Sequence, residues 1–333
     1  SVVVSRELIK YSGRFDFTDK EGPKFAWPKT SITINFEGDK LSAELESERL
    51  DYFLVVLDGR IHINCLPVKD KKIYNLVQDI EYGKHTVELV KKTESYISTA
   101  VFYGFDLHNG KLLERDKEKD LKIEIFGDSI TCGYGIESEH EDSPYEDISA
   151  NSYLAYGSIA ARDLKAEINL TAWSGLGLVR NYDDSPRPLP ERIEWITPQN
   201  EERLWDFNSY IPDIVLINLG TNDFNTYPPT REKYVNGYRT LINRIRGYYG
   251  RETKIICALG PSIDGKNLID AREYIKCGTV EFFKEQGDKN IFFLEHEHQK
   301  SENGYAQAYH PSALTHCLMA KELKKKINEI LNK

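Results

Sequence analysis

The chain has 333 residues, of which 40% are hydrophobic and 29% are charged, a composition typical of folded globular proteins. This length is more than one ordinary hydrophobic core supports, so we expect two domains. The formal net charge of −9 disfavours a nucleic acid or an anionic membrane as the partner, because like charges repel. No apolar run approaches the roughly 18 residues that span a bilayer, and we therefore expect a soluble protein with no membrane partner.

The N-terminus bears on the processing of the chain, whereas the cysteines leave its compartment open. The chain begins Ser-Val-Val-Val and contains one Met. We therefore expect a processed or excised end, from which a leader or a neighbouring module has been removed. The five cysteines show no Cys-x-x-Cys spacing and are odd in number, so buried free thiols are the simplest interpretation.

Residues 1–115 are predicted to form a β-sandwich domain. Short runs of alternating apolar and polar residues recur there, separated by turn residues, and no long helical pattern interrupts them. Many short strands at such spacing are typical of an antiparallel sandwich or jelly roll. A polar, charged stretch then suits a domain junction on the surface. The clearest strand candidates are 31–36, 52–57, 83–90 and 98–103.

Residues 121–333 are predicted to form an α/β domain. Strand and helix candidates alternate, which favours a mostly parallel sheet covered by helices on both faces, a three-layer α/β/α fold. The Pro-rich stretch 181–203 is expected to be an ordered surface excursion that walls the binding cleft or pads the domain junction. The strand candidates are 121–126, 166–172, 213–219, 254–259 and 290–295, and the helical candidates are about 151–164, 230–248, 267–286 and 312–331.

Ser129 lies in the motif Gly127-Asp-Ser, directly after the first of these strands. Ligands bind beyond the carboxyl ends of parallel strands, so this position suits a catalytic serine. Taken alone, Gly-Asp-Ser is better explained as a turn and a helix N-cap. Three further polar blocks favour the catalytic interpretation, because each follows a later strand or opens the last helix: Trp173-Ser-Gly175, Gly220-Thr-Asn-Asp223 and Tyr309-His-Pro-Ser312.

Together and in this order, the four blocks resemble those of the SGNH or GDSL hydrolases. The resemblance implies that Ser129 is the nucleophile and that His310 is the base that takes its proton, since imidazole titrates near neutral pH. It also implies an oxyanion hole, built from the backbone N–H groups of Ser129 and Gly175 and from the side-chain amide of Asn222.

The acidic residue of the family pattern is missing from this chain. SGNH enzymes commonly carry an Asp two or three residues before the histidine, where this chain has Ala308 and Gln307. Neither side chain carries a negative charge, so we expect a Ser-His dyad without the acid. The second imidazole nitrogen of His310 would then be held by a backbone carbonyl, by Gln307 or by water.

The order of the domains narrows the resemblance. A β-sandwich followed by an SGNH domain, with Phe25-Ala-Trp-Pro28 and Gly127-Asp-Ser-Ile-Thr-Cys-Gly-Tyr-Gly135, resembles carbohydrate esterase family two. The family implies a secreted acetyl xylan esterase that removes O-acetyl groups from xylan or glucomannan through an acyl-enzyme, often at the 6-hydroxyl. Its partner would be an acetylated plant polysaccharide or oligosaccharide and, in some members, a covalently linked glycoside hydrolase module. No cofactor or metal is implied.

Aromatic side chains near the blocks are candidates for stacking on a pyranose ring. With 20 tyrosines in the chain, some fall near a site by chance, so each candidate taken alone is weak. The first two of the following are favoured for their closeness to His310 and Gly175: Tyr309, Trp173, Tyr182, Tyr227 and Tyr134.

Other interpretations remain beside this one. His296-Glu-His298 would need a third ligand to bind a metal, and we expect a solvated strand end instead. Cys132 is expected to be a packing residue. A lipid or thioester hydrolase on the same fold would need an apolar acyl slot, against which the polar, Pro-rich stretch argues. A non-catalytic carbohydrate-binding module is the other alternative, motivated by the missing acid.

Overall fold

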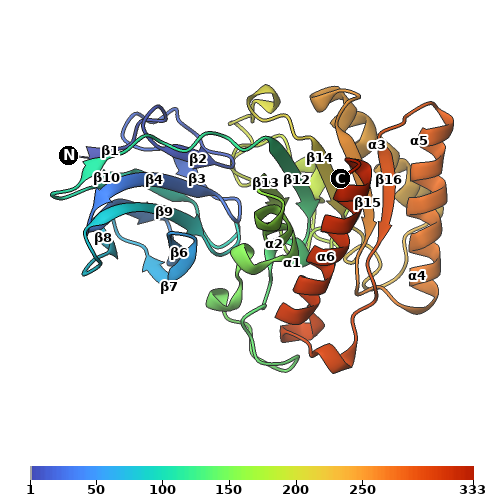
Figure 1. The fold of residues 1–333 in the computed structure, drawn as a ribbon. Coiled ribbons are helices and arrows are strands. Elements are labelled where there is room, and N and C mark those ends of the chain that lie inside the picture. The colour runs from blue at the N-terminus through green and yellow to red at the C-terminus, as the bar shows by residue number, and fades with distance from the viewer. Residues whose placement is uncertain (1) are drawn as a thin grey trace. The chain divides into compact units, whose positions relative to one another are not determined.

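The computed structural model describes residues 2–333, which fall into two compact units (Figure 1). The first unit takes the chain up to Glu118 together with Trp195–Trp205. The second unit takes Lys119–Glu194 and Asp206–Lys333. Among residues 2–333, no helix combines the length and the apolar character that a bilayer span requires.

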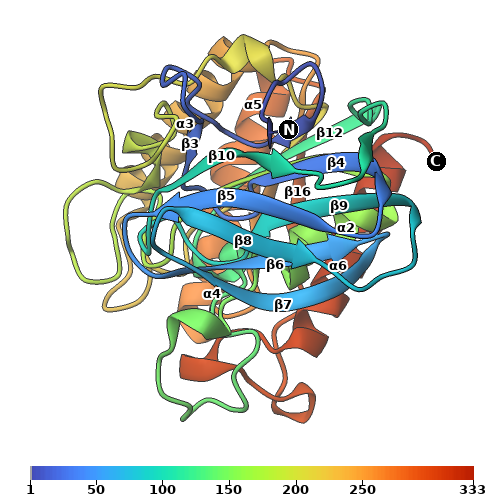
Figure 2. The ribbon, with the colours of Figure 1, turned by 90° about the vertical axis from the view of Figure 1, so that its left-hand side faces the viewer.

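The first unit contains two antiparallel sheets, and several of their strands lie across the view of Figure 2. One sheet has the order β1-β10-β5-β8, with β3 paired to β10, and the other has the order β11-β4-β9-β6-β7, with β2 paired to β4. The strands are β1 (Val2–Val3), β2 (Lys10–Ser12), β3 (Lys24–Phe25), β4 (Ser31–Gly38), β5 (Leu41–Ser47), β6 (Asp51–Leu57), β7 (Arg60–Val68), β8 (Lys72–Val77), β9 (Gly83–Lys91), β10 (Ala100–Asp106) and β11 (Lys111–Leu112).

The core of this unit is built from the alternation of residues along its strands. In β4, Ile32, Ile34 and Phe36 are all fully buried, because every second side chain of a strand points to the same face. Phe53 of β6 and Phe102 of β10 come from different sheets and join the same core. The predicted antiparallel β-sandwich is therefore confirmed.

A buried ion pair lies at the ends of two neighbouring strands of this unit. Lys91 Nζ is 3.1 Å from Asp51 Oδ2, and both side chains are fully buried. Lys91 Nζ also donates to the Glu94 carbonyl at 2.8 Å, and Asp51 Oδ1 accepts from the Tyr52 N–H at 2.7 Å. Each buried charge thus has a partner of opposite sign and a further hydrogen bond, which offsets the cost of removing it from water.

The second unit is organised around a five-stranded sheet in the order β13-β12-β14-β15-β16, in which all neighbouring pairs are parallel. The predicted parallel sheet is thus confirmed. The chain places β13 on one side of β12 and then β14 on the other, so the carboxyl end of β12 is a topological switch point. The strands are β12 (Leu121–Gly127), β13 (Ala166–Ala172), β14 (Ile214–Asn218), β15 (Lys254–Leu259) and β16 (Ile291–Glu295).

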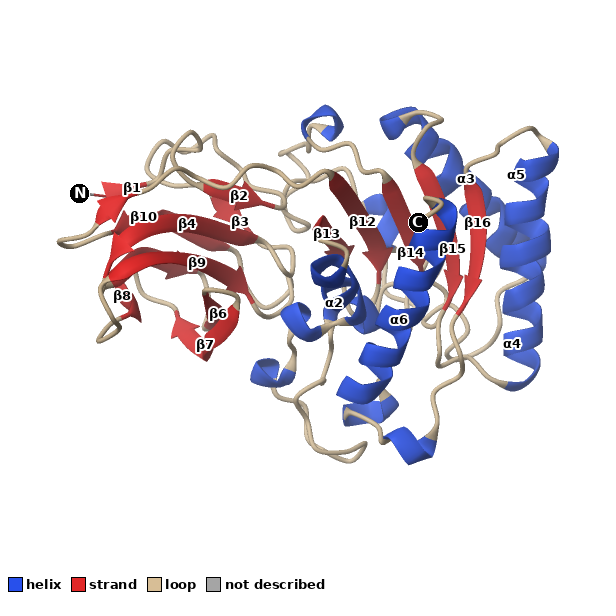
Figure 3. Cartoon of the chain, viewed as in Figure 1, coloured by secondary structure: helices blue, strands red, loops and turns tan. Residues whose placement is uncertain are grey.

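Helices cover both faces of this sheet. Residues of α2 and α6 share one core with Ile123, Ile125 and Leu216 of the strands, and the two helices lie together in front of the sheet in Figure 3. Tyr249 of α3 bonds Glu124, which points to the opposite face of β12. The helices are α1 (Ser129–Cys132), α2 (Tyr156–Asp163), α3 (Arg231–Tyr249), α4 (Gly265–Arg272), α5 (Phe282–Glu285) and α6 (Ala313–Ile330).

The predicted continuous helix 267–286 is wrong in one respect. A π-helical segment, Glu273–Glu281, separates α4 from α5. Its looser turns leave carbonyls that other groups satisfy: Arg239 Nε donates to the Gly278 carbonyl at 2.9 Å, and the Thr279 hydroxyl donates to the Tyr274 carbonyl at 3.0 Å. Short 3₁₀ helices lie at Asp147–Ser149, Ser152–Leu154, Leu189–Glu191, Phe207–Ser209, Ser301–Asn303 and Gln307–Tyr309.

The Pro-rich stretch 181–203 is divided between the two units. Its last part packs on Arg14 in the first unit, where the Arg14 guanidinium donates to the Trp195 carbonyl at 2.9 Å. The same guanidinium lies 5.1 Å from the ring of Trp205, just beyond the stretch. Trp27 flanks the same guanidinium at 5.7 Å. The stretch is therefore not a single excursion of the α/β domain.

The five cysteines only partly match the expectation of buried thiols. Cys132 and Cys257 are buried, whereas Cys277 and Cys317 are exposed and Cys65 is half-buried. The exposed thiols follow from helix geometry, because both residues lie on helical segments whose opposite faces carry the buried residues.

We expect the substitution Lys91→Met to lower the free energy of unfolding by about 3–5 kcal/mol, because it leaves the buried Asp51 carboxylate without its counter-ion. Urea unfolding measures the change. The matched control is Lys29→Met, which removes a looser pair of 3.4 Å with Glu88, whose side chain is 26% exposed. Equal losses for the two variants would contradict the assignment of Lys91 and Asp51 as a stabilising buried pair.

Candidate active site

Ser129 begins α1 immediately beyond the carboxyl end of β12. Asp128 is the N-cap, and its carboxylate accepts from the Ile130 N–H at 3.0 Å. The cap and the candidate nucleophile are therefore different residues. The turn before them requires Gly127, because a Cβ there would lie 2.1 Å from Thr131 Oγ1.

His310 faces Ser129 across the end of the sheet. His310 Nε2 lies 2.8 Å from Ser129 Oγ, and His310 Nδ1 lies 3.0 Å from the backbone carbonyl oxygen of Gln307. A carbonyl oxygen can only accept, so Nδ1 carries the proton and the lone pair of Nε2 points at the hydroxyl. Of the three holders predicted for this imidazole, the structure has the backbone carbonyl; the side-chain Oε1 of Gln307 is buried without a hydrogen-bond partner.

The surroundings of His310 favour its neutral form. Burial lowers the pKa of His310 from its ordinary value of 6.5 to about 4, although the backbone carbonyls of Gln307 and Ala308 act in the opposite direction. The ring of Tyr134 lies 4.2 Å from the imidazole, between centroids, and stacks on Tyr145 at 5.6 Å. At neutral pH the imidazole is therefore able to accept a proton.

The predicted oxyanion donors come from three strand ends that the sheet aligns. Gly127 of β12 is in register with Ala172 of β13 and with Asn218 of β14. Ser129, Gly175 and Asn222 follow these positions within two to four residues. Within residues 2–333, no protein acceptor bonds the backbone N–H group of Ser129 or that of Gly175.

Asn222 is tied to the segment that carries Gly175. Its Nδ2 donates to the Leu176 carbonyl at 2.9 Å, which leaves the second amide hydrogen for another acceptor. Gly175 has a φ of +84°, and a Cβ at this position would lie 2.8 Å from the ring of Tyr182. Both observations explain why glycine stands there.

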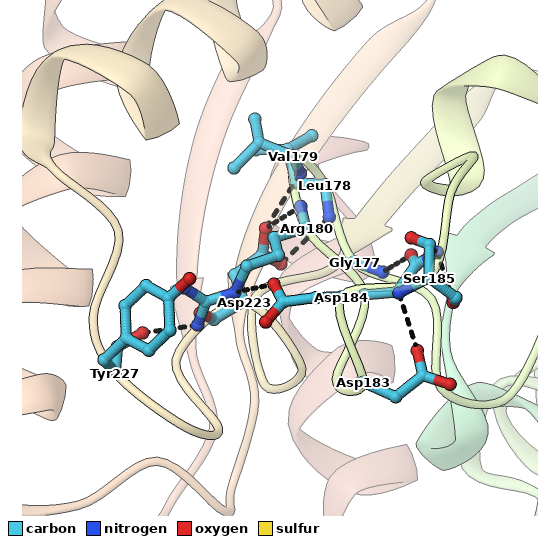
Figure 4. A network of polar contacts seen from close by, with 10 residues as sticks. Gly177, Leu178, Val179, Arg180, Asp183, Asp184, Ser185, Asp223 and Tyr227 are labelled. Carbon is cyan, nitrogen blue, oxygen red and sulfur yellow. Dashed lines mark hydrogen bonds and ion pairs between the residues drawn. The ribbon is translucent and has the colours of Figure 1, made fainter.

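Asp223 holds this segment through the network drawn in Figure 4. Its buried carboxylate accepts from the backbone N–H groups of Leu178, Val179 and Arg180 at 2.9, 2.8 and 3.1 Å. Gly177 permits the approach, because a Cβ there would lie 2.6 Å from Asp223 Oδ1. The residue after Asn222 therefore fixes the backbone after Gly175, so the two predicted donors are held as one unit.

The predicted sugar-stacking residues differ in how much of their surface is open. Tyr309 is 59% exposed and Tyr227 is 54% exposed, and the Arg180 guanidinium lies 3.8 Å from the Tyr227 ring (Figure 4). Trp173 is half-buried, and Arg192 lies over its ring at 4.2 Å. Tyr134 is half-buried and packs on His310, as described above. Tyr182 is 51% exposed, so Tyr309 and Tyr227 are the most open of the five.

The two histidines considered for a metal, His296 and His298, have other partners. Within the part of the chain that the structure describes, no group of three His, Cys, Asp or Glu side chains is arranged to hold a metal ion. His296 is buried, not solvated as expected, and its Nδ1 lies 3.1 Å from Glu322 Oε1. His298 is exposed, and its Nδ1 contacts the Gln299 carbonyl at 2.9 Å.

Family models match both parts of the chain. The family model described as Carbohydrate esterase 2 N-terminal matches residues 11–115, and that of the GDSL-like Lipase/Acylhydrolase family matches residues 125–316. A solved family two carbohydrate esterase from Clostridium thermocellum, in complex with cellohexaose, has 37% sequence identity and a TM-score of 0.94. The similarity covers 97% of this chain and 99% of that one.

The chain belongs to carbohydrate esterase family two. Among its curated relatives, the Cellulase/esterase CelE of Acetivibrio thermocellus is 38% identical over 97% of this chain, which spans 39% of the length of that protein. An Acetylxylan esterase / glucomannan deacetylase of Cellvibrio japonicus is 24% identical over all of this chain and 91% of its own length. The predicted family and fold are both confirmed.

Sequence analysis overlooked two members of the candidate site. Asp223 was visible in the Gly-Thr-Asn-Asp block, but nothing in the sequence showed that three backbone N–H groups 43 to 45 residues earlier bind its carboxylate. Tyr145, which stacks on Tyr134, was also overlooked, whereas Tyr182, one of the predicted stacking residues, lies against Gly175. The only indication of such a residue was an aromatic side chain in a predicted loop, and the chain has many aromatic residues.

We expect the imidazole of His310 to titrate near pH 4 in the folded protein, because burial disfavours the imidazolium more than the carbonyls of Gln307 and Ala308 stabilise it. NMR of ¹⁵N-histidine-labelled protein across a pH series gives the midpoint, and the spectrum of His310→Ala assigns the resonance. The same imidazole in the urea-unfolded chain should titrate near 6.5. A midpoint near 6.5 in the folded state would contradict the description of this site.

Proposed function

We propose that the chain is a serine esterase that removes O-acetyl groups from plant cell-wall polysaccharides such as xylan and glucomannan. The observation that carries the proposal is the 2.8 Å contact between Ser129 Oγ and the unprotonated Nε2 of His310. A hydroxyl becomes an effective nucleophile only when a base in such contact takes its proton. The names of the relatives support the substrate class.

The reaction would proceed in two halves. Ser129 Oγ attacks the acetyl carbonyl while His310 Nε2 takes its proton, and the new oxyanion accepts from the N–H groups of Ser129 and Gly175 and from the amide of Asn222. The intermediate then collapses, and His310 returns the proton to the departing sugar hydroxyl. Water then attacks the acetyl-Ser129 ester as His310 takes one of its protons. The bond between the acetyl carbon and Ser129 Oγ breaks, His310 returns that proton to Ser129 Oγ, and acetic acid leaves.

A carbonyl in place of a carboxylate suits an ester substrate. The Gln307 carbonyl selects the Nδ1–H tautomer of His310, which is one task of the acid in a Ser-His-Asp triad, but it cannot supply a full charge to the imidazolium. Esters have better leaving groups than amides, so they require less assistance from the base. We therefore infer a Ser129–His310 dyad that works on esters.

The polysaccharide would lie against the exposed aromatic rings beside the nucleophile. Tyr309 adjoins His310 in sequence, and Tyr227 presents a ring that Arg180 supports from one side. Flat faces of this kind stack on pyranose rings, while Trp173 would line the inner part of the site. The relative with bound cellohexaose supports an oligosaccharide as the ligand.

The setting we propose is extracellular, because the relatives are named for activities on plant cell-wall polysaccharides. The relative that combines the words cellulase and esterase is longer than this chain, which spans 39% of its length. This supports a chain that works as a module covalently linked to a glycoside hydrolase. Non-catalytic binding of a cello-oligosaccharide at the same site is a second candidate, which the bound cellohexaose of the relative favours.

We expect Ser129→Ala and His310→Ala each to abolish most of the hydrolysis of 4-nitrophenyl acetate and of acetate release from acetylated xylan and glucomannan. Asn222→Ala should lower kcat by about a hundredfold to a thousandfold, the usual cost of one oxyanion donor. The matched control is Asn225→Ala, an exposed residue of the same loop, which should keep wild-type rates.

The outcome separates the candidate functions. Unchanged esterase activity in Ser129→Ala, together with retained polysaccharide binding, would favour the non-catalytic candidate. Faster hydrolysis of octanoyl than of acetyl esters would favour a lipid hydrolase and contradict the proposed substrate.

A further inference from the structure

The peptide unit between Gln307 and Ala308 is held at both of its ends. Its carbonyl oxygen accepts from His310 Nδ1 at 3.0 Å, and its N–H donates to the Glu141 carbonyl at 2.9 Å. The direction of this one peptide plane therefore decides which nitrogen of His310 carries the proton and where Nε2 points.

The backbone after this peptide unit is strained. Ala308 has a φ of +53° and Tyr309 has a φ of +59°, a left-handed conformation that residues with a Cβ rarely adopt. Two such residues in succession, directly before His310, persist only where neighbouring contacts determine the conformation. The chain around Gln307 therefore needs external support.

Ser138 supplies that support from the loop that follows α1. Its hydroxyl accepts from the Gln307 N–H at 2.7 Å and donates to the Gly135 carbonyl at 2.5 Å, so both of its roles are used. Gly135 brings the loop close, because a Cβ there would lie 3.2 Å from the Cβ of Gln307. Ser138 and Glu141 thus fix the two peptide planes on either side of the Gln307 Cα.

We propose that Ser138 is a positioning residue for the general base, fixing the Gln307 peptide so that its carbonyl keeps His310 in the Nδ1–H tautomer. The inference rests on the proposed function of His310. Ser138 stands nine positions after Ser129 in the same segment, so the nucleophile and the support of its base belong to one continuous piece of chain. In this way a hydroxyl that touches neither substrate nor imidazole holds in place the carbonyl that performs the orienting task of the missing acid.

Kinetics of Ser138 variants test the proposal. Ser138→Ala should lower kcat for 4-nitrophenyl acetate by about tenfold to a hundredfold, part of what general base catalysis supplies, while KM changes little. Ser138→Thr keeps the hydroxyl and should restore most of the rate. The matched control is Ser143→Ala, which removes a hydroxyl of the same loop that accepts from the His140 N–H at 3.1 Å, and it should keep wild-type kcat.

A second variant and a second readout keep the test decisive. Ser138→Cys changes the size little but replaces the hydroxyl by a weak acceptor, so a loss of kcat is expected even if Ser138→Ala folds poorly. In ¹⁵N-histidine spectra, His310 should be the Nδ1–H tautomer in the wild type and in Ser143→Ala, and a mixture of tautomers in Ser138→Cys. The spectra do not depend on turnover.

Two results would overturn the inference: wild-type kcat in folded Ser138→Ala and Ser138→Cys, or an unchanged Nδ1–H tautomer in both. A wild-type protein without esterase activity would instead overturn the proposed function, and the tautomer spectra would still decide whether Ser138 positions the imidazole.

Discussion

The hydrogen bond from His310 Nδ1 to the Gln307 carbonyl is the interaction on which the candidate active site depends. It is 3.0 Å long and leaves Nε2 without a proton, 2.8 Å from the Ser129 hydroxyl. A backbone carbonyl gives direction but no net charge, so its value lies in how rigidly it is held. The left-handed backbone of Ala308 and Tyr309 is strained, which is the energetic cost of holding this carbonyl in place. The loop contacts that support these residues keep the strained backbone in its conformation.

The opposite side of the site is built on the same principle. Parallel strands bring Ser129, Gly175 and Asn222 to one edge of the sheet, but strand ends alone fix loops only loosely. Asp223 adds the missing constraint, because its buried carboxylate gathers three consecutive backbone N–H groups of the segment after Gly175. Donors placed in advance of the reaction are what stabilise an oxyanion, since they need no reorganisation when charge develops.

Much of this architecture could be predicted from the sequence, since it depends on local periodicity. The alternation of Ile32, Ile34 and Phe36 and the apolar run that ends at Gly127 specify strands without reference to distant residues. The four blocks specify Ser129 and His310 by their order. The structure contains the predicted strands and turns because burial and turn chemistry act over a few residues.

The contacts that could not be predicted join residues far apart in the chain. Ser138 bonds a backbone group 169 residues later, and Asp223 bonds backbone groups that carry no side-chain signature at all. Trp195 joins the first unit through Arg14, 181 residues away, which no composition shift indicated. The π-helical segment depends on Arg239 from another helix. Tertiary partners decide each of these features.

A crystal structure of the protein with Ser129 covalently bound to an acetyl-like methylphosphonate would test the central claim most directly, because the adduct imitates the tetrahedral intermediate. We expect one phosphonyl oxygen to lie within about 2.7–3.1 Å of the backbone nitrogens of Ser129 and Gly175 and of Asn222 Nδ2. His310 should still donate to the Gln307 carbonyl. An adduct whose oxygens face solvent, or an imidazole turned away from both Ser129 and Gln307, would contradict the account.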